Sequence, residues 1–226
     1  MTGAAGAGPP PLVVSDRRLG SLQVRDGELV VLLGGSGAGK TTWLRLLVGL
    51  GPGRFDSAEL FGRRLTKDAI AASIGWVPQG DGVFLSESVL ANVMGPRPGR
   101  GCSAASAHDA LDMVGLADRA LDPVQHLGIG ARRRVALARA LARKAPLVVI
   151  DGALDATLWA LFLAMRSSLD WVRGWLVADC MAGEVAWRAE SVALLGGGRV
   201  IAQAPLADLI DSSDPAIRSV ISEVTT

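Results

Sequence analysis

The chain has 226 residues, and its 23 Lys and Arg stand against 22 Asp and Glu, which gives a formal net charge of +1. This near balance gives no support for a basic nucleic-acid groove or a polybasic membrane anchor. Half of the residues are apolar and 20% are charged, which excludes a disordered chain and predicts one domain with a sizeable core. Glycine is abundant, with 28 residues, and tyrosine is absent.

The N-terminal sequence MTGAAGAGPPP lacks the basic and apolar regions of a signal peptide. Its Gly, Ala and Pro content predicts a flexible tail over residues 1–11. The longest apolar runs, such as residues 156–165, reach about half of the roughly 20 residues that a membrane span needs. Cys102 and Cys180 are the only thiols in a long chain, which indicates reduced cysteines rather than a disulfide framework. We therefore expect a soluble domain in the cytoplasm.

Along the rest of the chain, short apolar runs alternate with helical patterns. Residues 29–33, LVVLL, predict a strand buried on both faces, because turn residues bound the run on each side. We expect helices at residues 41–50, 104–114, 132–144 and 156–169, and further strands at residues 74–77, 147–150, 175–178, 191–195 and 200–201. Strands joined by helices predict an α/β fold whose mainly parallel sheet is flanked by helices.

A phosphate-binding motif follows the first buried strand. Residues 34–42, GGSGAGKTT, match the pattern G-x-x-x-x-G-K-[ST] where a helix is expected to begin. Its glycines would let backbone N–H groups and the helix N-terminus point at phosphate oxygens. Lys40 would place a positive charge at the β- and γ-phosphates, and the Thr41 hydroxyl would bind Mg²⁺. The nucleotide-binding residues expected in this loop are Gly34, Gly35, Ser36, Gly37, Ala38, Gly39, Lys40, Thr41 and Thr42.

Three further segments narrow the choice among phosphate-loop families. Residues 77–79 read VPQ and end 39 positions after Lys40 (79 − 40), residues 131–141 read ARRRVALARAL, and residues 145–151 read APLVVID. Together with the loop, they resemble the nucleotide-binding domain of ATP-binding-cassette (ABC) transporters. A small-molecule kinase is disfavoured, because these segments would then be unexplained.

The resemblance implies both a domain organisation and a set of roles. It implies a P-loop NTPase core with a β-rich N-terminal part over residues 12–79 and 142–226, and an inserted helical subdomain over residues 80–141. Gln79 would contact Mg²⁺ and the attacking water and sense the membrane partner. Asp151 would be the Walker B carboxylate that holds Mg²⁺ through water.

The signature loop departs from the family pattern. Where the family has L-S-G-G-Q, this chain has Leu127, Gly128, Ile129, Gly130 and Ala131. The missing serine hydroxyl would weaken the contact with the γ-phosphate of the opposite subunit, although the backbone N–H groups at the helix start remain.

The groups that drive hydrolysis are also missing. Gly152 stands where the family has the glutamate that activates water, and loss of a positioned base typically costs about 10²–10⁴ in rate. Asp155 follows a contracted loop and would be a D-loop aspartate with altered reach, unsuited as a substitute base. Cys180 stands where the family has the switch histidine, and the carboxylate of Asp179 beside it would repel the γ-phosphate.

The adenine platform is the fourth departure. Residues 12–22 contain no aromatic side chain. Arg17 or Arg18 could stack on adenine through a guanidinium group, although a solvated pair is the favoured interpretation.

These observations predict a subunit that binds Mg-ATP but does not hydrolyse it competently. It would pair with a second, competent ABC subunit or with itself, and both would rest on transmembrane permease subunits at the cytoplasmic side of the cell membrane. No nucleic-acid partner is expected. Two alternatives stay open, namely an active transport ATPase with a substitute catalytic residue, and a nucleotide-dependent regulator or scaffold outside transport.

Overall fold

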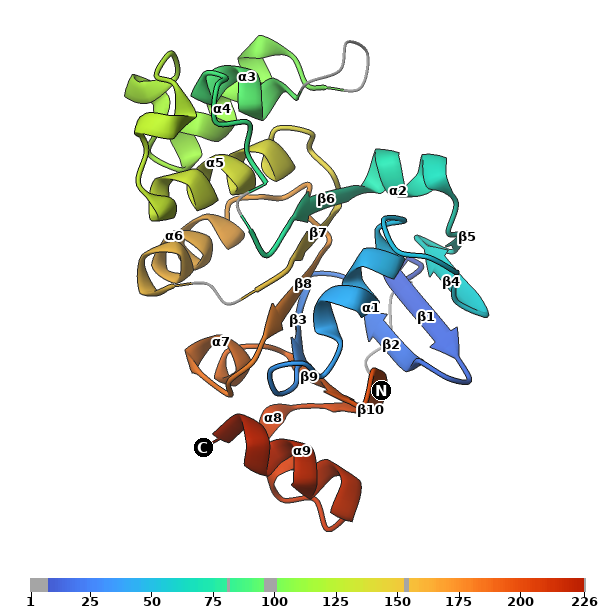
Figure 1. The fold of residues 1–226 in the computed structure, drawn as a ribbon. Coiled ribbons are helices and arrows are strands. Elements are labelled where there is room, and N and C mark those ends of the chain that lie inside the picture. The colour runs from blue at the N-terminus through green and yellow to red at the C-terminus, as the bar shows by residue number, and fades with distance from the viewer. Residues whose placement is uncertain (1–7, 81, 96–100, 153–154, 226) are drawn as a thin grey trace, which may run out of the picture.

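The computed structural model describes residues 8–80, 82–95, 101–152 and 155–225, which form two sheets and their helices (Figure 1). The strands are β1 (Leu12–Asp16), β2 (Gly20–Val24), β3 (Glu28–Leu33), β4 (Ser57–Leu60), β5 (Arg63–Arg64), β6 (Ile74–Val77), β7 (Leu147–Ile150), β8 (Gly174–Asp179), β9 (Ser191–Gly196) and β10 (Arg199–Ala204). The α-helices are α1 (Lys40–Leu47), α2 (Lys67–Ser73), α3 (Val89–Met94), α4 (Ala104–Met113), α5 (Ile129–Leu141), α6 (Ala156–Arg166), α7 (Glu184–Trp187), α8 (Leu206–Ile210) and α9 (Pro215–Thr225). Two short 3-10 helices, η1 (Ala117–Arg119) and η2 (Val124–His126), precede α5.

The larger sheet has six strands in the order β10-β9-β3-β8-β7-β6. Every neighbouring pair in it is parallel except β9 and β10, which form a hairpin. The smaller sheet is antiparallel, with the order β2-β1-β4-β5. The predicted α/β class, with a mainly parallel sheet and a β-rich N-terminal part, is confirmed.

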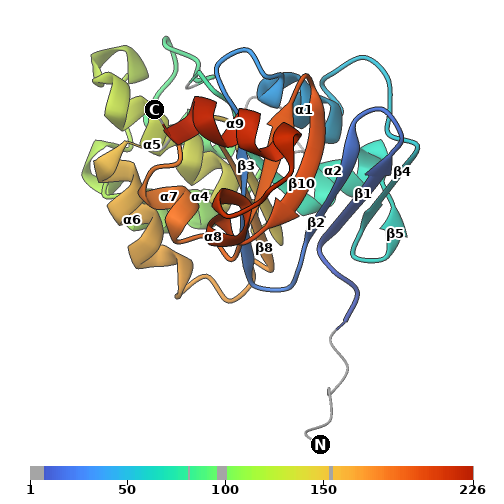
Figure 2. The same cartoon turned by 90° about the horizontal axis from the view of Figure 1, so that it is seen from below.

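Strand β3 explains how the core is divided. All six of its residues are buried, as the continuous apolar run predicted. Because side chains alternate across a strand, Val30 and Leu32 enter a core shared with α1 and the small sheet, whereas Val31 and Leu33 enter a core shared with α5, α6 and α9. Figure 2 shows the same arrangement as layers, with α5 and α6 on one side of the large sheet and the small sheet on the other.

The segment between β6 and α3 is held by one buried amide. Asn92 of α3 is fully buried. Its Oδ1 accepts a hydrogen bond from the Phe84 N–H at 2.7 Å, and its Nδ2 donates to the Phe84 carbonyl at 2.9 Å and the Ser88 carbonyl at 3.0 Å. This clamp positions the chain between β6 and the helices α3, α4 and α5, which gather at one end of the molecule (Figure 1).

Helix ends differ from the predicted ones where the backbone turns into the left-handed region. Helix α1 ends at Leu47 rather than at residue 50, because Gly49 has a φ of 72°. Helix α5 begins at Ile129 directly after Gly128, and it ends at Leu141 rather than at residue 144. Lys144 has a φ of 50°, and its N–H donates to the Leu141 carbonyl at 2.8 Å, which closes the turn.

Three expectations about the chain as a whole can be placed. Residues 1–7 of the expected tail lie outside the described residues, whereas Pro11 is buried and its carbonyl accepts a hydrogen bond from the Phe61 N–H. Cys102 and Cys180 are free thiols, as expected. In the described part of the chain, no helix combines the length and the apolar character that crossing a membrane requires.

Candidate nucleotide site

The predicted phosphate loop joins β3 to α1 at the carboxyl end of the large sheet. A Cβ atom on Gly34 would collide with the Leu195 carbonyl oxygen of the neighbouring strand β9. Gly39 is the N-cap of α1 and has a φ of 100°, a backbone conformation that residues other than glycine rarely adopt. The loop therefore needs glycine at both positions, and it leaves backbone N–H groups of the first helical turn without an intrahelical acceptor.

Lys40 lies across this loop. Its Nζ donates to the Gly34 carbonyl at 2.6 Å and to the Gly35 carbonyl at 2.9 Å. The cation is thus held beside the N–H groups that open α1, and both features favour an anion at the same place.

The three side chains predicted to bind Mg²⁺ come together next to the phosphate loop. The Thr41 hydroxyl lies 3.1 Å from Oδ1 of Asp151 and 3.2 Å from Oε1 of Gln79. These residues belong to α1, the end of β7 and the end of β6, so the sheet edge brings them together. Hydroxyl, carboxylate and amide oxygens are the ligand types that Mg²⁺ prefers.

The carboxylate of Asp151 fits a bound cation. It is only 2% exposed, and its Oδ2 is a buried atom with no hydrogen-bond partner among the described residues. Burial raises the pKa of the Asp151 carboxyl, while the Thr41 hydroxyl and the Lys40 charge oppose that shift. A buried acceptor without a partner is costly, and Mg²⁺ or its bound water would satisfy it.

These groups surround a single cavity of about 380 Å³. Most of the predicted phosphate-loop residues line it, together with both sites of expected catalytic loss. Its lining residues are Ser36, Gly37, Gly39, Lys40, Thr41, Thr42, Gln79, Asp151, Gly152, Ala178, Asp179 and Cys180. The signature-loop residues, Asp155 and the two arginines Arg17 and Arg18 do not line it.

Gly152 follows Asp151 in an unusual backbone conformation. Its φ is 98°, and a Cβ atom there would lie 3.3 Å from Cγ of Gln79 and 3.7 Å from a guanidinium nitrogen of Arg133. Position 152 therefore lacks an acceptor group, and its backbone also disfavours any side chain in that place.

At the end of the neighbouring strand β8, Asp179 is only 7% exposed. Its Oδ1 accepts hydrogen bonds from the backbone N–H groups of Cys180 at 2.7 Å and Met181 at 3.3 Å. Cys180 itself is exposed at the cavity. This part of the cavity thus offers an acidic group and a thiol rather than an imidazole donor.

The signature-loop residues open α5, away from the cavity of their own chain. Leu127 is buried, whereas Ile129 is 78% exposed. Gly128 is the N-cap and supplies no side-chain hydrogen bond. The first N–H groups of α5 are thus presented without a side-chain cap.

The carboxylate of Asp155 caps a helix and does not line the cavity. Asp155 is the N-cap of α6, and its carboxylate accepts a hydrogen bond from the Leu158 N–H at 2.9 Å. Residues 153–154 of the contracted loop lie outside the described residues.

Arg17 and Arg18 lie in the turn between β1 and β2. Arg17 is 92% exposed and pairs with Asp56, with its Nε 3.2 Å from Oδ2 of Asp56. Asp16 fixes the turn by accepting hydrogen bonds from the N–H groups of Leu19 and Arg18, and the Leu19 contact holds the pKa of the Asp16 carboxyl below its usual range. Arg17 is thus turned toward Asp56 and solvent.

Two charged neighbours of the cavity were missed from the sequence. Arg133, on α5, is half-buried, and a guanidinium nitrogen lies 3.7 Å from the point that a Cβ of Gly152 would occupy; it has no hydrogen bond or ion pair with any described residue. Glu223, on α9, lies at the phosphate loop, with Oε2 2.9 Å from the point that a Cβ of Gly35 would occupy. In the sequence, the arginine run at residues 132–134 is the one sign of Arg133, and no pattern indicates Glu223.

Comparison with known proteins gives the family. The family model described as "ABC transporter" matches residues 19–155, which is more than half of the chain. The sulfate/thiosulfate import ATP-binding protein CysA of Pseudomonas aeruginosa is 37% identical over 148 residues, covering 60% of this chain and 45% of that protein. The cytochrome c biogenesis ATP-binding export protein CcmA of Salmonella typhi is 38% identical over 135 residues, covering 58% of this chain and 63% of that protein.

A solved structure agrees on the fold. That of cbiO1 from Clostridium perfringens, part of the ABC transporter complex cbiONQ, has a TM-score of 0.73 at 22% identity and covers 94% of each chain. The alignments span about half the length of the curated relatives that the chain matches. The chain therefore belongs to the ABC transporter family and has the α/β P-loop fold of its nucleotide-binding domain.

Proposed function

We propose that this chain binds Mg-ATP through its phosphate loop and serves as the catalytically degenerate half of an asymmetric pair of nucleotide-binding subunits. The observation that carries the proposal is Gly152, which has a φ of 98° and no acceptor group where the family has its catalytic glutamate. The cavity thus holds the groups expected to bind nucleotide, whereas positions 152 and 180 lack the side chains expected to hydrolyse it.

The binding half of the proposal rests on the contacts among Lys40, Thr41, Gln79 and Asp151. Lys40 and the helix N-terminus would hold the phosphates, and the oxygens of Thr41, Gln79 and Asp151 would hold Mg²⁺ directly or through water. Bound Mg²⁺ would neutralise charge on the β- and γ-phosphates. The buried Oδ2 of Asp151, which has no hydrogen-bond partner in the described part of the chain, supports this assignment.

The paired half of the proposal rests on α5. This helix begins at the exposed Ile129, and its N-cap residue, Gly128, makes no side-chain hydrogen bond. Neither residue lines the cavity of its own chain. In the family, the corresponding loop acts on the nucleotide of the opposite subunit. We propose that residues 80–141 form the inserted subdomain that carries this loop, and that residues 12–79 and 142–226 form the core.

A permease contact is proposed on the surface beside β6. Leu50, Phe84 and Leu85 are 59%, 45% and 46% exposed. A hollow of about 270 Å³ near Leu50 is lined by Ile70, Trp76 and other residues. Exposed apolar side chains beside an apolar hollow suit a partner segment. Docking there would place the chain at the cytoplasmic side of a membrane.

The proposal is tested by measuring binding and turnover separately. Titration calorimetry of the purified chain should show Mg-ATP binding that Lys40→Ala weakens by about 100-fold, while steady-state ATPase stays at background. In the transporter reconstituted with its permease and second cassette, Gly152→Glu with Cys180→His should raise ATPase. Because position 152 disfavours side chains, Cys180→His alone and a thermal melt of each variant serve as controls.

Two results would contradict the proposal. ATPase of the purified wild-type chain that is well above background, and that Lys40→Ala abolishes, would favour an active enzyme. No shift of the melting temperature by Mg-ATP would favour a scaffold that does not use nucleotide.

One observation favours an active ATPase as the second candidate. Besides Asp151, Asp179 also lines the cavity, and it ends β8, the strand that pairs in parallel with β7 before Gly152. If ATPase is found, Asp179→Asn should abolish it, whereas Asp155→Asn, at the α6 cap, should leave the rate nearly unchanged. Equal rates in wild type and Asp179→Asn would exclude this residue as the base.

A further inference from the structure

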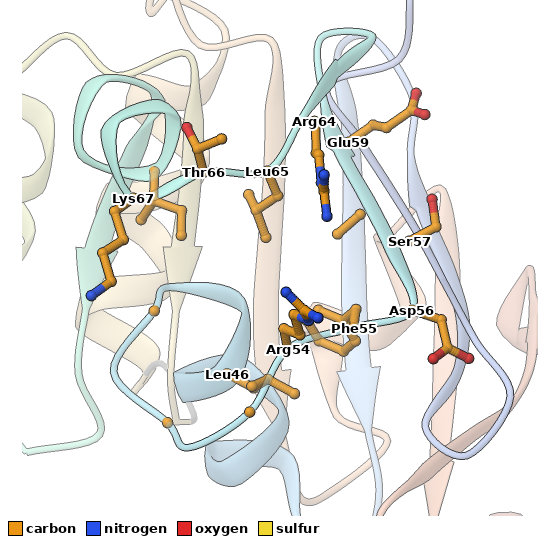
Figure 3. Close-up of a pocket in the computed structure, with 15 residues that line it drawn as sticks. Leu46, Arg54, Phe55, Asp56, Ser57, Glu59, Arg64, Leu65, Thr66 and Lys67 are labelled. Atoms are coloured by element: carbon orange, nitrogen blue, oxygen red, sulfur yellow. The ribbon is translucent and has the colours of Figure 1, made fainter.

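A second pocket lies beside the C-terminal end of α1, whereas the phosphate loop precedes the N-terminal end of that helix. Figure 3 shows this pocket. Its volume is about 590 Å³, within the range of small-molecule sites. It is enclosed by the end of α1, the chain from Gly49 to Arg54, strands β4 and β5, and the start of α2. It shares none of its lining residues with the nucleotide cavity.

Two arginines face each other across this pocket. The guanidinium groups of Arg54, before β4, and Arg64, on β5, point toward one another (Figure 3). Among the described residues, neither has a hydrogen bond or an ion pair with an acidic group. Lys67 adds a third cation on the α2 side. Like charges that converge without a counter-ion favour an anion between them.

The acidic residues of the pocket do not fill this role. Asp56 is engaged outside, because its Oδ2 accepts hydrogen bonds from the backbone N–H and the Nε of Arg17, both at 3.2 Å. Glu59 is the cross-strand neighbour of Arg64, yet no ion pair joins them. Both carboxylates point away from the hollow (Figure 3).

The base of the pocket is apolar. Phe55 is only 6% exposed and packs on Trp43, with ring centroids 5.0 Å apart. Leu46, Leu65 and Ile70 are half-buried around it. A ligand that fills the pocket would therefore place an apolar body on Phe55 and an anionic group between the guanidinium forks.

We propose that this pocket binds a soluble phosphate monoester with an aromatic or apolar body, at a site distinct from the nucleotide cavity. Phosphate suits the site because a guanidinium group binds it through two parallel hydrogen bonds, and a dianion matches two facing arginines. The proposal does not depend on whether the chain hydrolyses ATP.

The test is titration calorimetry of the full chain with 1-naphthyl phosphate, in a Lys40→Ala background that weakens the phosphate loop. One site should appear, and Arg54→Gln and Arg64→Gln should each weaken it by about tenfold or more. Arg63→Gln is the matched control, because Arg63 is the exposed neighbour of Arg64 on β5 and does not line the pocket. Inorganic phosphate should bind more weakly, and 1-naphthol should not bind measurably.

Four results would overturn the proposal. These are equal affinity in Arg54→Gln, Arg64→Gln and Arg63→Gln, equal affinity for 1-naphthol, and binding that is present in wild type but lost with Lys40→Ala alone. The fourth is binding to vesicles that contain phosphatidic acid without binding of the soluble probe, which would assign the anion to a lipid. Because all three arginines are exposed, thermal melts should show the variants folded.

Discussion

The two sides of the proposed nucleotide cavity present different chemical groups. The phosphate side consists of backbone N–H groups at the start of α1, the charge of Lys40, and the contacts of Thr41 with Gln79 and Asp151. The proposed reaction side has Gly152 and Cys180, at the positions where the resemblance to the family places a glutamate and a histidine. In the proposed function, the first set binds the nucleotide, whereas the second lacks the acid–base groups that hydrolysis needs.

The proposed function separates binding from hydrolysis within one fold. Phosphate recognition is fixed mainly by the strand, loop and helix that build the core, so it persists as long as the fold does. Hydrolysis depends on a few side chains at strand ends, which can change without affecting the core. Substitutions on each side of the cavity should therefore have separate effects on binding and on turnover.

Lys40→Ala should weaken Mg-ATP binding by about 100-fold, because charge-assisted contacts with phosphate are among the strongest hydrogen bonds. Equilibrium titration with ATP provides the measurement. Lys144→Ala removes an exposed lysine outside the cavity and should leave the affinity unchanged. Equal losses in both variants would mean that general charge, rather than the phosphate side, attracts the nucleotide.

Gly152→Ala should destabilise the fold by about 1–2 kcal/mol, because a side chain is forced into the left-handed region. Urea unfolding provides the measurement. Gly130→Ala is the contrasting control, since Gly130 lies in α5 with open space at its Cβ position and should gain about 0.5 kcal/mol. If Gly152→Ala is as stable as wild type, the loop adapts to a side chain at position 152. The backbone conformation there would then not disfavour a glutamate.

Much of the fold could be predicted because its strands are continuous apolar runs between turn residues. Predicted strands at residues 74–77 and 147–150 coincide with β6 and β7. Helix ends were harder, because the left-handed conformation of Lys144 ends a sequence that favours helix on both sides of Leu141.

The site divides along the same line. Contiguous motifs gave the phosphate loop, Gln79 and Asp151, and the structure brings them into one cavity. Arg133 and Glu223 escaped notice, because helices far away in sequence carry them to Gly152 and Gly35. The arginine run at residues 132–134 indicates a basic helix, but local sequence does not indicate which distant residue such a side chain contacts.

Asp151→Asn should stabilise the chain in the absence of nucleotide and Mg²⁺ while weakening Mg²⁺-dependent ATP binding. Burial raises the pKa of Asp151, so the folded state favours its neutral form and carries a penalty at neutral pH. That penalty lessens as the pH falls through the folded-state pKa, and it is gone below the ordinary pKa of an aspartate. The stability gap between variant and wild type, measured by urea unfolding, should therefore close on acidification. A gap that widens would show that Asp151 is stabilised as a carboxylate.

Glu223→Gln should strengthen ATP binding only two- to threefold, since Glu223 is exposed and its repulsion of phosphate is screened. The carboxylate lies at Gly35, on the phosphate side, so its removal should act on affinity and leave ATPase at background. Asp118→Asn makes the same change of net charge in the helical part of the chain and should have no effect. The gain should shrink as salt is added. An equal gain in both variants would show that net charge, rather than the place of Glu223 beside the loop, sets the affinity.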